Sequence, residues 1–152
     1  PLLGLSADCA LTVFYDPCRK VLAVAHSGWR GALLDIYGGV LNVMRLRFGC
    51  EPADITAGVS PMISAAHYPV KEDFLEKLKA FHPGGADKRF LTLKEGRHFF
   101  NLRELLRLRL ETLGVGNYES MHLCTYAEKE QFYSWRRDGE KTGRFGLIAT
   151  LT

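Results

Sequence analysis

Residues 2–31 read LLGLSADCALTVFYDPCRKVLAVAHSGWRG, and this stretch decides the fold. Asp16 and Pro17 favour a turn in its middle, because proline presets φ and aspartate accepts hydrogen bonds from nearby backbone N–H groups. The apolar, β-prone runs around this turn are typical of strands, and the last of them is apolar enough to be covered on both faces. The predicted strands are residues 2–6, 11–15 and 21–25.

Helices and strands follow one another along the rest of the chain. Gly49 and Gly114 are suited to end helices, and Asn101 with Glu104 forms a capping-box pattern before one of them. This succession predicts a single α+β (mixed α/β) domain over residues 1–152, with mixed β-sheets flanked by helices. Apolar spacing predicts helices over residues 32–48, 71–81 and 102–113, strands over 55–59, 118–123 and 145–151, and a loop over 82–87.

The composition is that of an ordinary globular domain, with 47% hydrophobic and 24% charged residues. The net charge is +3, but the basic residues are dispersed, which argues against a nucleic-acid partner. No apolar run has the length of a membrane span, so we expect no membrane partner. The four cysteines form no CxxC pair, which favours reduced thiols and a cytoplasmic location.

Cys9 and His26 form the candidate reactive pair, because a short turn joins their strands and can bring the two side chains close. Thiolate sulfur and imidazole nitrogen are standard zinc ligands. A thiolate beside an imidazole is equally an activated nucleophile. The residue types leave both interpretations open, and either residue taken alone is more often structural.

Arg30 is a candidate anion-binding residue, since it lies where a predicted strand gives way to a predicted helix. Helix N-termini attract anions, and a guanidinium binds phosphate with two hydrogen bonds. A structural salt bridge is the alternative. Arg137 follows several aromatic residues and either shapes a pocket for a planar ligand or pairs with Asp138. Asp8 is suited to orient a ligand or to a buried structural role.

Several motifs occur in a fixed order: ADC at residues 7–9, YDP at 15–17, HSGWRG at 26–31, CT at 124–125, YSWRRD at 133–138 and GR at 143–144. In this order the chain resembles the YfiH family from Leu3 to its end. That family has been called multicopper polyphenol oxidase or laccase-like, and it is also described as purine nucleoside phosphorylase. ADC followed by HxGWRG at this separation is a highly specific combination. The resemblance implies a YfiH-like layered sandwich.

The resemblance also implies a zinc site made of one cysteine and two histidines. Cys9 matches the cysteine and His26 matches one histidine, while the other family histidine lies in a segment that precedes the ADC strand. We therefore expect the third ligand upstream of Pro1 and a chain that lacks an N-terminal segment. His67 stands where the family has cysteine.

The implied activity is zinc-dependent phosphorolysis of adenosine and inosine, with adenosine deamination and methylthioadenosine cleavage as side activities. The implied small-molecule substrates are a purine nucleoside and phosphate. The alternatives are a Cys–His hydrolase or amidase acting on a cell-wall precursor, a copper-dependent polyphenol oxidase, and a non-enzymatic binding module. Five histidines without a His-x-His pair disfavour several copper ions. The expected roles are catalytic for Cys9, His26 and Arg30, and substrate-binding for Asp8, Arg30 and Arg137.

Overall fold

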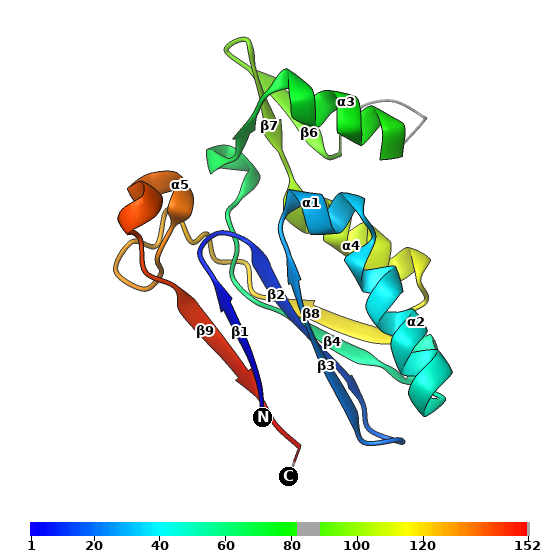
Figure 1. The fold of residues 1–152 in the computed structure, drawn as a ribbon. Coiled ribbons are helices and arrows are strands. Elements are labelled where there is room, and N and C mark those ends of the chain that lie inside the picture. Colours follow the sequence, from blue (N-terminus) through cyan, green and yellow to red (C-terminus); the bar gives the residue numbers. More distant parts are fainter. Residues whose placement is uncertain (82–88, 152) are drawn as a thin grey trace.

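The computed structural model describes residues 1–81 and 89–151, and it stacks three layers (Figure 1). A two-stranded antiparallel sheet lies on one face of a four-stranded sheet, and helices cover the other face. Within the four-stranded sheet β4 and β8 run parallel, while β2 runs antiparallel to both β3 and β4. The sheet is therefore mixed, and the predicted α+β class is confirmed. The strands are β1 (Leu2–Ser6) with β9 (Phe145–Ala149), and then β3 (Val21–Ser27), β2 (Ala10–Asp16), β4 (Thr56–Val59) and β8 (Asn117–Ser120) in sheet order.

Strand β2 holds the three layers together, because its alternate side chains point to opposite faces. Phe14 faces the helices and meets the Tyr37 ring edge-on, with 5.2 Å between ring centroids. The Thr12 and Tyr37 hydroxyls are hydrogen-bonded on the same side. Leu11 faces β1, where a Cβ on Gly4 would lie only 3.0 Å from the leucine side chain. Both Phe14 and Leu11 are fully buried, and each contributes about 2 to 3 kcal/mol of hydrophobic stabilisation.

The helical layer differs from the prediction at its start. The single helix expected over residues 32–48 is two helices, because Asp35 adopts the left-handed conformation (φ 56°) and interrupts it. The Asp35 carboxylate caps the second helix by accepting a hydrogen bond from the Gly38 N–H at 3.1 Å. It also binds Arg109, with 2.6 Å between Oδ1 and Nε. The helices of this layer are α1 (Trp29–Leu33), α2 (Ile36–Phe48) and α4 (Leu102–Thr112).

The helix ends behave as their sequences indicate. Gly49 closes α2 in the left-handed conformation, and the Asn101 side chain accepts a hydrogen bond from the Glu104 N–H at the start of α4. Position 38 needs a glycine, because a Cβ there would lie 2.1 Å from the Asp35 carboxylate. The glycine therefore leaves room for the cap.

A third, three-stranded sheet was not predicted. Its hairpin turns at Glu95 and Gly96, which both have positive φ (51° and 71°), the signature of a two-residue hairpin turn. That dipeptide, between runs rich in apolar residues, is the signal that indicates the hairpin. Helix α3 packs near this sheet (Figure 1), and the loop predicted over residues 82–87 lies outside the described residues. These elements are β5 (Pro69–Val70), β7 (Arg97–Phe100), β6 (Leu91–Lys94) and α3 (Glu72–Phe81).

Short helical turns complete the fold, and α5 among them was not predicted. In the described part of the chain, no helix has both the length and the apolar character that crossing a membrane requires. The turns are η1 (Pro52–Asp54), η2 (Ala65–His67), α5 (Trp135–Asp138) and η3 (Gly139–Lys141).

Removing the Asp35 side chain tests the junction between α1, α2 and α4. Asp35→Ala loses the cap, the ion pair and a residue that tolerates positive φ, so we expect the free energy of unfolding to fall by about 2 kcal/mol. Asp35→Asn keeps the acceptor and the backbone preference, and should lose about half as much. Urea unfolding at pH 7 measures both.

The same junction predicts a pH dependence. Burial tends to raise the pKa of Asp35, but hydrogen bonds from Arg109 and Gly38 lower it below its ordinary value. Its stabilisation is therefore complete above the unfolded pKa of about 3.9 and is lost as the pH falls through the lower folded pKa. The stability difference between wild type and Asp35→Asn should shrink over that range, and a difference independent of pH would contradict the ion pair.

Candidate functional site

Cys9 and His26 lie on one face of the β2–β3 hairpin. The register pairs Ala10 with Ser27 and Leu11 with His26, so Cys9 comes next, opposite Gly28. A Cβ on Gly28 would lie 2.6 Å from the Cys9 sulfur, which shows how closely the thiol approaches that backbone. By register, Cys9 and His26 are thus diagonal neighbours across the hairpin, a spacing of about 7 to 8 Å that an aromatic side chain such as the imidazole can reach across.

The two side chains differ in environment. His26 is exposed, whereas Cys9 is partly buried. Burial raises the pKa of the Cys9 thiol, the neighbouring Asp8 carboxylate raises it further, and Arg144 acts in the opposite direction. In the absence of a bound cation the protein therefore favours the protonated thiol, the opposite of the activated thiolate that the hydrolase alternative requires.

Asp8 is buried beside Cys9 and adopts a positive φ of 88°. One carboxylate oxygen accepts a hydrogen bond from the Thr125 hydroxyl at 2.7 Å. The other accepts from the Ser134 hydroxyl at 3.0 Å and from the Arg136 N–H at 2.7 Å. Both oxygens therefore accept hydrogen bonds from the protein, which is a structural role. The ligand-orienting role of Asp8 stays a prediction.

Arg137 also serves the fold. Its guanidinium donates to the backbone carbonyls of Thr125, Tyr126 and Phe132 at 2.9 to 3.1 Å. It forms an ion pair with Asp138 at 2.8 Å. All three guanidinium nitrogens are engaged, so Arg137 anchors the 125–132 loop to α5. The geometry does not support the substrate contact that the sequence suggested for it, which remains untested.

Other cationic and aromatic residues gather around Cys9. The Arg136 side chain is exposed and lies over the Tyr68 ring, with 5.5 Å from its guanidinium carbon to the ring centroid. Arg144 acts electrostatically on Cys9 and lies 5.6 Å over the Trp135 ring. Tyr68 is buried, and this burial, together with the nearby Cys9 and Asp8, raises its pKa, while Arg136 acts in the opposite direction.

From the sequence, Arg136 was considered only together with Arg137 as part of a possible pocket, and Tyr68 only as part of a candidate edge. Neither residue, nor Arg144, was given a role at the site. They come from segments that are far from Cys9 along the chain, and no spacing rule connects such segments. Only the GR motif pointed to Arg144, and only through the family resemblance.

Arg30 is exposed, and its guanidinium lies over the neighbouring Trp29 ring, with 5.0 Å to the ring centroid. It lines a shallow hollow together with Lys77 and apolar side chains. The helix that contains it, α1, has only five residues, because Asp35 interrupts the helical segment. The macrodipole argument for an anion at Arg30 is therefore weaker than the sequence indicated, and its phosphate-binding role stays a prediction.

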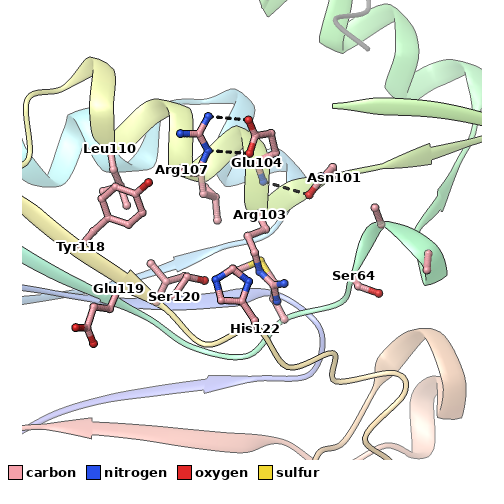
Figure 2. Close-up of a pocket in the computed structure, with 15 residues that line it drawn as sticks. Ser64, Asn101, Arg103, Glu104, Arg107, Leu110, Tyr118, Glu119, Ser120 and His122 are labelled. Carbon is pink, nitrogen blue, oxygen red and sulfur yellow. Dashed lines mark hydrogen bonds and ion pairs between the residues drawn. The ribbon is translucent and has the colours of Figure 1, made fainter. Parts of the chain in front are cut away.

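A large cavity of about 730 Å³ lies elsewhere, between α4 and the end of β8 (Figure 2). Its floor is apolar, and Arg103, His122 and Ser64 contribute polar groups to its wall. None of Cys9, His26 and Asp8 lines it. The candidate chemistry and this cavity are thus separate features of the protein.

The residues present fit part of a metal site. Cys9 and His26 offer a sulfur and a nitrogen from one face, and the missing Cβ of Gly28 leaves room for the sulfur. Within residues 1–81 and 89–151, no group of three histidine, cysteine or acidic side chains is placed to share an ion. As ligands, Cys9 and His26 stay a prediction, and the described residues supply no third partner for them.

The family described as multi-copper polyphenol oxidoreductase laccase matches residues 1–152. The chain belongs to this family. Purine nucleoside phosphorylase YlmD of Bacillus subtilis is 36% identical over 140 residues, covering 91% of this chain and 50% of that protein. A purine nucleoside phosphorylase of Bacteroides thetaiotaomicron is 34% identical over 144 residues, covering 91% and 52%.

Solved structures of this laccase family share the fold. The crystal structure of the Bacillus licheniformis hypothetical protein YfiH superposes with a TM-score of 0.86 at 38% identity, covering 95% of this chain and 55% of that one. These likenesses confirm the YfiH resemblance. The chain spans about half the length of the curated relatives it matches, at 50% and 52% of them.

The Asp8 contacts predict a loss of stability when the charge is removed. Asp8→Asn keeps the size and the tolerance of positive φ, but it exchanges one acceptor oxygen for an NH₂ donor that faces other donors. Because hydrogen bonds to a charged group contribute about 1.5 to 3 kcal/mol, we expect the free energy of unfolding to fall by about 2 to 3 kcal/mol.

Glu130→Gln is the matched control, since its side chain is 86% exposed. It should change stability by less than about 0.5 kcal/mol in the same urea titration. An Asp8→Asn protein as stable as the control would contradict the structural role of this carboxylate.

Proposed function

We propose that this chain carries part of the active site of a purine nucleoside phosphorylase. The observation that carries the proposal is the placement of Cys9 and His26 on one face of a hairpin, in a chain whose curated relatives bear that name. The nearby guanidinium groups of Arg136 and Arg144 support it, because the reaction uses phosphate and guanidinium groups bind phosphate well.

In phosphorolysis, the bond between ribose C1′ and purine N9 breaks, and a phosphate oxygen forms a new bond to C1′. The departing base takes up a proton. We propose that Arg136 and Arg144, together with Arg30, hold the phosphate against C1′. The exposed Trp135 ring offers a flat surface for the purine. Adenosine and inosine are the proposed substrates, with adenosine deamination and methylthioadenosine cleavage as side activities.

We propose zinc as the metal, with Cys9 and His26 as two of its ligands. A bound zinc ion would supply a Lewis acid that polarises an oxygen or activates water. The third ligand would be a histidine from outside residues 1–152. Copper is the less favoured alternative, although the same donors accept it and the family description names it.

Two other activities compete with this proposal. A Cys–His hydrolase or amidase would need a Cys9 thiolate, and the raised pKa of that thiol disfavours it. A polyphenol oxidase would use copper at the same donors and would be recognised by oxidation of a phenol without any requirement for phosphate. We place the reaction in the cytoplasm, in keeping with four free cysteines.

Replacing the proposed ligands should remove the metal. In the complete protein, we expect Cys9→Ser and His26→Ala to lower bound zinc at least about tenfold, because each removes one ligand. Elemental analysis measures zinc per chain, and phosphate-dependent release of hypoxanthine from inosine measures activity. Cys18→Ser is the control, as Cys18 is an exposed cysteine far from the pair in the hairpin. Full zinc content and full turnover in both ligand variants would contradict the proposal.

Shortening Arg136 should weaken phosphate binding. Arg136→Ala leaves its backbone N–H on Asp8 but removes a guanidinium, so we expect the KM for phosphate to rise about tenfold, equivalent to roughly 1.4 kcal/mol. Arg45→Ala removes an exposed arginine from the last turn of α2 and should leave that KM unchanged. An equal effect of the two substitutions would argue that Arg136 has no part in binding.

A further inference from the structure

Cys124 and His67 form a second thiol–imidazole pair, apart from Cys9 and His26. The Cys124 sulfur lies 3.5 Å from Nδ1 of His67. The His67 ring is stacked on Tyr126 with 4.4 Å between ring centroids, which holds the imidazole in place. A nucleophile and a base within hydrogen-bond reach, with the base oriented by a further group, form the arrangement that activates thiols.

The surroundings of Cys124 donate hydrogen bonds to its sulfur. The Ser64 N–H donates to the sulfur at 3.3 Å. Burial by itself would raise the pKa of the Cys124 thiol, but hydrogen bonds from Ser64 and from the Ala127 and Tyr126 N–H groups bring it below its ordinary value. A thiol that accepts several N–H donors is stabilised as the thiolate.

The guanidinium of Arg103 places a positive charge near Cys124. Arg103 interacts electrostatically with Cys124, and its guanidinium donates to the carbonyl of the adjacent Leu123 at 3.0 Å. Arg103 and Ser64 both line the cavity between α4 and β8 (Figure 2), so this cavity borders two residues that act on Cys124. Cys124 is itself only partly buried.

We propose that Cys124 is a modification site, at which hydrogen peroxide oxidises the thiolate. The sulfur attacks one peroxide oxygen, so that an S–O bond forms and the O–O bond breaks. Sulfur is oxidised to the sulfenic acid and the peroxide is reduced. His67 accepts the thiol proton as the thiolate forms and passes it to the departing hydroxide, which leaves as water. A small thiol then condenses with the sulfenic acid, forming a mixed disulfide and releasing a second water.

Modification of Cys124 would disturb the position of the segment that carries Asp8 and Cys9. Thr125 follows Cys124 directly, and its hydroxyl holds the Asp8 carboxylate beside Cys9. A larger oxidised sulfur at position 124 therefore lies one residue from the contact that positions the Asp8–Cys9 segment. The proposal does not require nucleoside activity, and it is tested on the thiol itself.

The test compares Cys124 with Cys18, an exposed cysteine of the same chain. The complete protein is treated with limiting hydrogen peroxide at pH 7, sulfenic acid is trapped with dimedone, and each cysteine is quantified by mass spectrometry. We expect Cys124 to be trapped about tenfold faster than Cys18, because reactivity follows thiolate character. Its alkylation by iodoacetamide should also have a lower pH midpoint. Equal rates and midpoints for the two cysteines would overturn the proposal.

Two substitutions separate activation by His67 from simple exposure. His67→Phe keeps a ring for stacking on Tyr126 but removes Nδ1, so trapping at Cys124 should slow about tenfold and the midpoint should rise. His122→Phe changes an exposed histidine and should alter neither. The Ser64 hydroxyl lies 3.2 Å from Nδ1 of His67, and its hydrogen bond helps to lower the pKa of the Cys124 thiol. Ser64→Ala keeps the N–H donor and removes this hydroxyl; a raised midpoint there supports the proposal even if His67→Phe does not fold. Wild-type reactivity in both His67→Phe and Ser64→Ala would refute it.

Discussion

The buried carboxylate of Asp8 is the interaction on which the rest of the site depends. Asp8 lies in the connection between β1 and β2 with a positive φ, and its carboxylate accepts hydrogen bonds from Thr125, Ser134 and Arg136. These donors belong to segments more than a hundred residues away. A buried charge must be satisfied by such donors or the fold loses several kcal/mol. The same contacts therefore fix where Cys9 lies and where α5 begins.

The charged groups around the Asp8 carboxylate act in opposite directions on the Cys9 thiol. Asp8 and burial favour the protonated thiol of Cys9, whereas Arg144 opposes them. A cation bound at the sulfur would reverse the preference, because a coordinated thiol gives up its proton. Arg136 extends from the same backbone that holds Asp8, so the fold presents a guanidinium and a thiol to the same region.

The chain contains two thiol–imidazole pairs with different geometry. Cys9 and His26 are diagonal neighbours on a hairpin, and the thiol is held in its protonated form. Cys124 and His67 are in contact, and N–H donors stabilise the thiolate. The residue types are the same in both, so the difference comes from desolvation and hydrogen bonding. The first pair is suited to sharing a metal, and the second is suited to reacting directly.

The sequence by itself determined the strands around residues 2–27, the C-terminal end of α2, both ends of α4, and the family, because these follow from local periodicity, capping residues and ordered motifs. The tertiary structure alone decided the break at Asp35, since a left-handed aspartate is stabilised there by Arg109, 74 residues away. It also directed Arg137 into backbone contacts while leaving the Arg136 side chain exposed. Neighbouring residues in a short helix point in different directions, and only packing selects which one faces the site.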